Sequence, residues 1–168
     1  MSRPTRLHRA REGFTIIEML IVVLILAILA GILVPVLEEE LRAASDSRRA
    51  SDLKTVQAAL ESYYRVNQSY PDTGGAWQGD APNFGGFGYD AAGYIPGIVP
   101  DYMQALPKDP SNAFPDGADG GYMYRSDGSD YKFVINLSPE FYVHGNPYFD
   151  PTRPNTAWQV SSPGGYNW

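Results

Sequence analysis

The longest apolar stretch of the chain runs from Met19 to Leu37 and carries no charged residue. As an α-helix its 19 residues span roughly 28 Å, which matches the hydrocarbon core of a bilayer. The pattern therefore predicts a transmembrane helix. The two alternatives are a secretory signal peptide removed after about residue 30 and a buried core helix. The run is long for a signal peptide, and the small residues that a signal peptidase prefers are poorly placed.

The helical pattern continues past the apolar run, because residues 38–66 contain neither Gly nor Pro and are rich in helix-forming residues. We therefore expect one helix from near Phe14 to about Val66. Pro35 lies inside it and removes one backbone hydrogen bond. This predicts a kink or local melting between Gly31 and Pro35.

The second half of this helix is predicted to be amphipathic, since apolar residues recur there at spacings of three and four. The stripe consists of Leu53, Val56, Leu60 and either Tyr63 or Tyr64. Such a face is expected to pack against a small domain. The stretch from Glu38 to Asp52 lacks the stripe, so we expect it to face water or to pack between subunits.

From residue 67 onward the chain is rich in loop-forming residues, with 15 Gly and 12 Pro. The clearest strand signal is a hairpin with arms at 121–125 and 130–137 and a turn at 126–129. In the second arm Tyr131, Phe133, Ile135 and Leu137 alternate with Lys132, Val134 and Asn136. The predicted fold class is α+β, with the long helix packed against a small antiparallel sheet that has long Gly-, Pro- and aromatic-rich loops.

Charge divides the chain into three parts. Residues 1–13 carry four arginines against one glutamate, whereas the rest carries 9 basic and 18 acidic side chains. Because positive charge flanks the cytoplasmic end of a span, we expect a cytoplasmic leader at 1–13, a membrane helix at 14–37 and an outer domain at 38–168.

The acidic domain argues against nucleic acid as a partner. Without cysteine the fold has neither disulfides nor thiolate metal sites.

Glu18 is a lone carboxylate at the edge of the apolar run. A charged group inside the hydrocarbon costs about 2.5–3.5 kcal/mol, so such residues are usually paired or functional. Cleavage between Gly13 and Phe14 would give Phe14 a free α-amino group, with an ordinary pKa of about 7.7–8.0. This amine is the expected partner of Glu18, and pairing between chains would set the stagger of one helix on the next. The simpler alternative is that Glu18 reaches back to the aqueous interface.

The segment Gly13 to Pro35, GFTIIEMLIVVLILAILAGILVP, closely resembles the processing and methylation segment of type IV pilins and type II secretion pseudopilins. The resemblance implies cleavage at Gly13 by a prepilin peptidase, N-methylation of Phe14 and a role for Glu18 as the assembly carboxylate. It also implies a pool of subunits in the inner membrane, with the C-terminus outside, and a periplasmic or extracellular filament. The implied partners are further copies of the chain, minor pilin-like subunits, an inner-membrane assembly platform and the lipid bilayer.

Two further motifs resemble the major pseudopilin of type II secretion. They are Tyr64 with Tyr70-Pro71, and Leu106-Pro107-Lys108-Asp109-Pro110. The chain departs from that family at Ser111-Asn112, where Trp-Gly is common, and between Asp72 and Asp101, which is longer than usual. Because of the two motifs, a secretion pseudopilus is nevertheless favoured over a type IV pilus or a DNA-uptake filament.

Major pseudopilins tend to hold calcium in a C-terminal loop, so structural calcium is a possible cofactor implied by the resemblance. Calcium takes six to eight oxygen ligands. The candidate ligands are Asp116 with Asp119, or Asp127 with Asp130. After Leu137 only Glu140 and Asp150 are acidic, so the family's site does not carry over residue by residue. Aspartates that form turns are the simpler interpretation.

Two functions from different classes follow. The favoured one is a structural subunit that polymerises through its membrane helix. The other is a membrane-tethered module that binds glycans or proteins through the aromatic stretch from Trp77 to Tyr102. An enzyme is disfavoured, because the chain has no nucleophile elbow, paired-histidine motif or ordered carboxylate pair.

Overall fold

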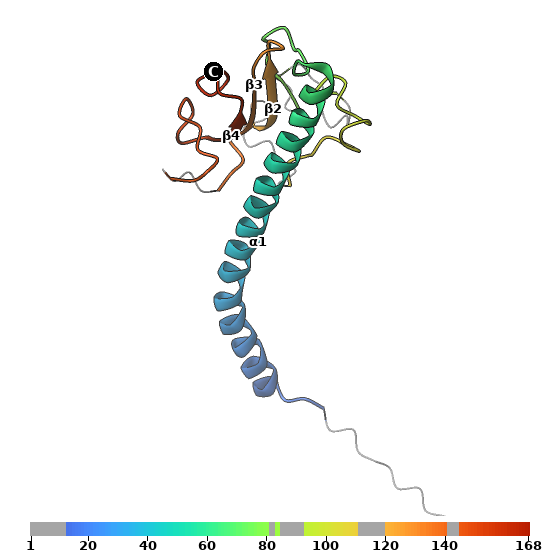
Figure 1. Ribbon diagram of the computed structural model, residues 1–168. Coiled ribbons are helices and arrows are strands. Elements are labelled where there is room, and N and C mark those ends of the chain that lie inside the picture. The colour runs from blue at the N-terminus through green and yellow to red at the C-terminus, as the bar shows by residue number, and fades with distance from the viewer. Residues whose placement is uncertain (1–12, 81–82, 85–92, 111–119, 141–144) are drawn as a thin grey trace, which may run out of the picture. The chain divides into compact units, whose positions relative to one another are not determined.

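The computed structural model describes residues 13–80, 83–84, 93–110, 120–140 and 145–168 (Figure 1). It divides after Glu40 into two compact units. We call the second unit, Leu41–Trp168, the globular body. One helix, α1 (Ile16–Asn67), contributes to both units.

Helix α1 has 52 residues, as the unbroken helical pattern predicted. It begins at Ile16 and ends at Asn67, close to the predicted ends near Phe14 and at about Val66. The helix continues without interruption through Pro35, so local melting there was the wrong alternative. One missing N–H bond does not end a helix whose other turns are intact. The kink at Pro35 stays a prediction.

The globular body contains one antiparallel sheet with the strand order β1-β2-β3-β4. Its strands are β1 (Gln78–Gly79), β2 (Gly121–Ser126), β3 (Tyr131–Asn136) and β4 (Ala157–Ser161). The predicted hairpin is confirmed, with Gly121 opposite Asn136 and Ser126 opposite Tyr131. The structure adds β1 and β4, which the sequence analysis did not predict, and the α+β class is confirmed.

The main core lies between α1 and one face of the sheet. The predicted stripe residues Leu53, Val56 and Leu60 are completely buried there, and burying such side chains contributes about 1.5–3 kcal/mol each. The sequence did not decide between Tyr63 and Tyr64 as the last residue of the stripe. Tyr63 is partly buried and packs against Tyr102, whereas Tyr64 is 37% exposed. The sheet contributes mainly aromatic rings to this core, namely Tyr122, Tyr124, Tyr131 and Phe133, together with Ile135.

Two expectations about burial need correction. Leu137 was expected on the core face of the second hairpin arm, but β3 ends at Asn136 and Leu137 is 37% exposed with a positive φ of 56°. Lys132 and Val134, on the opposite face of β3, are completely buried as well. Both faces of β3 are therefore covered. The stretch from Glu38 to Asp52 does not merely face water, because Asp46 and Arg49 are buried and extend the stripe toward the N-terminus.

Candidate processing and assembly site

Gly13 and Phe14 directly precede α1 and are exposed. A Cβ atom built on Gly13 meets no atom within 4 Å, so the fold of this chain does not itself require glycine at that position. The Phe14 ring is 77% exposed. A requirement for glycine at position 13 would therefore come from a molecule that acts on the chain, as expected for a protease site.

Glu18 caps the first turn of α1 together with Thr15. The Glu18 carboxylate accepts hydrogen bonds from the Thr15 backbone N–H at 2.8 Å and from its hydroxyl at 2.7 Å. In return the Thr15 hydroxyl oxygen accepts a bond from the Glu18 N–H at 3.3 Å. This reciprocal arrangement is a capping box. The sequence analysis missed the role of Thr15, although the spacing Thr15-Ile16-Ile17-Glu18 fits the capping-box pattern.

The apolar segment, residues 14–37, has its large hydrophobic side chains exposed, from 49% to 83%. Within the described residues α1 is the one helix long and apolar enough to cross a membrane, with a mean hydropathy of 3.3 in its most apolar window and none of that window buried. A run of this kind exposed to water would be strongly unfavourable. The segment therefore needs lipid or other protein around it.

Within the globular body, the motif from Leu106 to Pro110 is held against α1 by a buried ion-pair network. Asp109 accepts two hydrogen bonds from the Arg49 guanidinium, at 2.9 and 3.0 Å, and Asp46 accepts a third at 2.8 Å. Burial opposes the charge of Arg49, but the two carboxylates outweigh it and raise its pKa. Asp46 also accepts a bond from the Glu140 N–H. This network is a structural part of the fold.

Comparison with known proteins identifies the family. The N-terminus, residues 8–34, matches the model of the prokaryotic N-terminal methylation motif, a range that includes Gly13, Phe14 and Glu18. The type II secretion system core protein G of Aeromonas hydrophila is 31% identical over 110 residues, which cover 61% of this chain and 68% of that protein. The chain belongs to the type II secretion pseudopilin family.

Other relatives match over a shorter range. The core protein G of Pseudomonas aeruginosa is 39% identical over 66 residues, covering 39% of this pseudopilin and 46% of that protein. The core protein G of Dickeya chrysanthemi is 33% identical over 67 residues, which cover 40% of this chain and 44% of that protein. The alignment thus spans less than half the length of these two relatives. No solved structure matches the chain significantly.

Of the two predicted pairs of calcium ligands in this pseudopilin, the structure describes one. Asp116 and Asp119 lie outside the described residues. Asp127 accepts hydrogen bonds from the backbone N–H groups of Ser129 and Asp130, which lower its pKa. Asp130 accepts bonds from the Ser162 hydroxyl at 2.6 Å and from the Gly164 N–H at 3.0 Å. No cluster of three or more His, Asp or Glu suited to a metal occurs among the residues that the structure describes.

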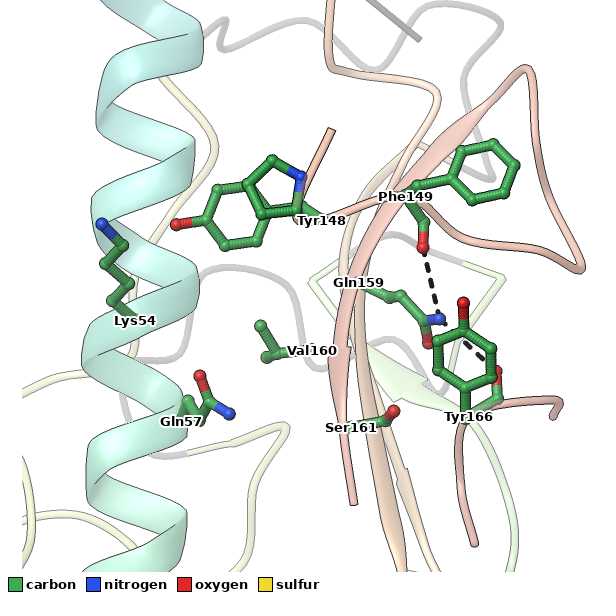
Figure 2. A pocket seen from close by; sticks show the side chains of 9 residues that line it. Lys54, Gln57, Tyr148, Phe149, Gln159, Val160, Ser161 and Tyr166 are labelled. Carbon is green, nitrogen blue, oxygen red and sulfur yellow. Dashed lines mark hydrogen bonds between the residues drawn. The ribbon is translucent and has the colours of Figure 1, made fainter. Parts of the chain in front are cut away.

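The globular body has a groove between α1 and β4 (Figure 2). It encloses about 360 Å³ and is lined by Lys54 and Gln57 from α1, by Gln159 to Ser161 from β4, and by Tyr148 and Tyr166 from the segments beside β4. By contrast, the described part of the stretch from Trp77 to Tyr102 contributes Tyr94, Ile95 and Ile98 to the core. Residues 81–82 and 85–92 of that stretch lie outside the described residues, so the binding-module hypothesis stays a prediction.

Proposed function

We propose that the chain is a structural subunit of a type II secretion pseudopilus, a filament that acts in protein export, and that it is not an enzyme. The observation that carries this proposal is the exposed apolar segment 14–37 with Glu18 as its one charged side chain. Membership in the core protein G family supports the secretion branch over a type IV pilus or a DNA-uptake filament.

Processing creates the charge that assembly requires. A prepilin peptidase removes residues 1–13 and leaves an α-amino group on Phe14, which is then N-methylated and stays cationic at neutral pH. Glu18 is the one carboxylate within the apolar segment. In the filament the amine of one subunit pairs with Glu18 of a neighbour, which neutralises both charges within the apolar bundle. Before cleavage this cation does not exist, so processing acts as the switch for polymerisation.

The subunit resides in the inner membrane before assembly, as a single-pass protein with the globular body outside. An assembly platform in that membrane extracts it into the filament, where it packs against further copies and minor pilin-like subunits. Exposure of the apolar segment supports this course, because lipid covers that surface in the first state and neighbouring helices cover it in the second.

The capping box provides the control that this hypothesis needs, because Glu18 has a local role as well as the proposed one. Glu18→Gln removes the charge, whereas Thr15→Val removes the hydroxyl that the carboxylate binds and leaves the charge in place. We expect Glu18→Gln to abolish filaments and Thr15→Val to retain them. The measurement is the amount of sheared filament in a strain that expresses the full-length protein at equal levels, with the membrane-bound pool as reference.

Equal loss of filaments in both variants would contradict the proposal, because it would show that Glu18 serves only to cap the helix. Filaments retained in both variants would also contradict it. The cleavage step has its own control, since Gly13 replaced by a bulky residue is expected to leave chains in the membrane that never enter filaments.

A further inference from the structure

Lys132 is a fully buried cation in the globular body. Its side chain extends from β3, on the sheet face opposite to Tyr131 and Phe133. The ammonium lies 2.9 Å from a carboxylate oxygen of Asp150, which is also completely buried. A buried lysine requires such a partner, because an uncompensated charge in the interior is very costly.

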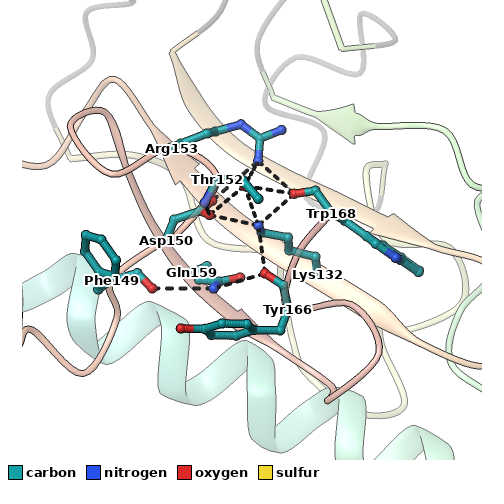
Figure 3. Close-up of polar contacts among 8 residues, drawn as sticks. All are labelled: Lys132, Phe149, Asp150, Thr152, Arg153, Gln159, Tyr166 and Trp168. Atoms are coloured by element: carbon teal, nitrogen blue, oxygen red, sulfur yellow. Dashed lines mark hydrogen bonds and ion pairs between the residues drawn. The ribbon is translucent and has the colours of Figure 1, made fainter.

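The Lys132 ammonium also contacts three further oxygens of the C-terminal segment, residues 145–168 (Figure 3). The Thr152 hydroxyl lies at 2.9 Å and the backbone oxygens of Trp168 and Tyr166 lie at 2.8 and 3.3 Å. All four acceptors thus come from the C-terminal segment, while the cation comes from the sheet. Lys132 therefore connects four acceptor residues, the first and last of which, Asp150 and Trp168, are 18 positions apart in the chain.

The surroundings of Asp150 show that this arrangement is complete. Its carboxylate accepts bonds from the Thr152 N–H and hydroxyl, at 2.9 and 2.7 Å, and from Arg153 at 3.4 Å. Burial opposes the charge of Asp150, but the bonds from Lys132 and Thr152 outweigh it and lower its pKa. The carboxylate is therefore ionised at neutral pH and is neutralised by side chains of the same molecule.

A calcium ion does not fit this group of oxygens. Calcium needs six to eight oxygen ligands at about 2.3–2.6 Å, and several of them are usually carboxylates. Asp150 supplies the one side-chain carboxylate of this group, and the centre of the oxygens is filled by the ammonium nitrogen. Calcium, which resemblance to major pseudopilins implies in a C-terminal loop, would have to displace a lysine bonded to four oxygens.

We propose that Lys132 is the built-in cation of the C-terminal segment, so that this segment is ordered by an ammonium group and not by calcium. The order of residues 145–168 is then independent of calcium concentration. The proposal concerns the stability of the body and does not depend on filament assembly.

The first test needs no variant. The full-length protein in detergent micelles is kept in millimolar EDTA or in millimolar CaCl₂, and hydrogen exchange of residues 145–168 is followed by mass spectrometry. We expect the same exchange rates in both solutions. Exchange of these residues that is faster in EDTA and slowed again by CaCl₂ would overturn the proposal, because it would show that the order of this segment requires the metal.

The second test asks what Lys132 holds in place. Lys132→Met keeps the length of the side chain and removes its charge, and Lys54→Met does the same for an exposed lysine of α1. Hydrogen exchange measured by mass spectrometry then compares residues 145–168 with the helical residues 41–67. We expect protection of 145–168 to fall by roughly 10²- to 10³-fold in Lys132→Met, and to stay unchanged in Lys54→Met.

A milder variant keeps this test decisive if Lys132→Met fails to fold. Asp150→Asn retains the shape of the side chain and the lysine, and we expect it to increase exchange in the same residues by a smaller factor. The proposal is refuted if exchange in 145–168 is no faster in Asp150→Asn than in Lys54→Met. It is also refuted if residues 41–67 lose protection to the same extent as 145–168, since a general loss of stability would then explain the result.

Discussion

The apolar segment and the globular body differ in whether their charged side chains have an oppositely charged partner. In the globular body the buried cations Arg49 and Lys132 each meet carboxylates of the same chain within 3.0 Å. In the apolar segment Glu18 contacts only the neutral Thr15 among the described residues. The body therefore pairs these two buried cations by itself, while Glu18 of the segment has no cationic partner among the described residues.

The two regions differ in the same way in their apolar surface. Leu53, Val56 and Leu60 are completely buried, whereas Leu20, Leu24 and Leu26 of the same helix are about 60% exposed. Both sets are apolar residues in regular α-helix, so helix formation does not distinguish them. The difference shows which part of α1 serves the fold and which part serves an environment outside the chain.

Removing the buried cation Arg49 is expected to have the largest effect. Arg49→Met removes the guanidinium that neutralises the buried carboxylates of Asp46 and Asp109, which costs about 3–5 kcal/mol. Arg48→Met is the control, because Arg48 is the exposed neighbour. The free energy of unfolding is measured by urea titration of the full-length protein in detergent. If both variants lose the same free energy of unfolding, the buried ion pairs of Arg49 do not stabilise the body, and the contrast with the apolar segment fails.

The comparison of apolar surfaces is tested by one substitution made at two positions of α1. Leu53→Ala is expected to lower the free energy of unfolding of the body by about 3 kcal/mol, because it leaves a cavity in the core. Leu24→Ala is expected to leave it unchanged, since Leu24 is 60% exposed. The same urea titration reports both values. A destabilising effect of Leu24→Ala on the body would show that the two regions depend on each other.

Much of this architecture could be predicted from sequence periodicity. The spacing of three and four gave the buried face of α1, and alternation gave the hairpin of β2 and β3. Strand β4 was missed, because Ala157 to Ser161 is short and lies between loop-forming residues. Periodicity identifies an element by its own side chains, and a short strand is defined mainly by its neighbours.

The buried charges could not be predicted for a related reason. Arg49 and Asp109 are 60 residues apart, and Lys132 and Asp150 are 18 apart. Local pattern therefore gives no sign that these residues meet, and charged residues are ordinarily exposed. The candidate site is the opposite case. Gly13, Phe14 and Glu18 are adjacent in sequence, so the local pattern was enough to identify them.

Asp80 is the exception to the rule that the body pairs its buried charges, and it gives the smallest of these effects. It is 2% exposed, and one carboxylate oxygen accepts the Tyr122 N–H at 2.8 Å while the other has no hydrogen-bond partner among the residues that the structure describes. Burial raises its pKa to about 7, and the nearby Asp109 adds to the shift. The folded state therefore holds this proton up to a higher pH than the unfolded chain, whose aspartate has a pKa of about 3.9.

It follows that ionisation of Asp80 destabilises the fold as the pH rises from about 4 to about 7. Asp80→Asn keeps the acceptor for Tyr122 and removes the charge. Relative to the unmodified protein, we expect this variant to gain about 2–3 kcal/mol of stability between about pH 5 and about pH 8. Urea titrations at the two pH values give the difference. A constant difference across this range would mean that Asp80 is already ionised at about pH 5, and that its charge is compensated as fully as the charges of Lys132 and Arg49.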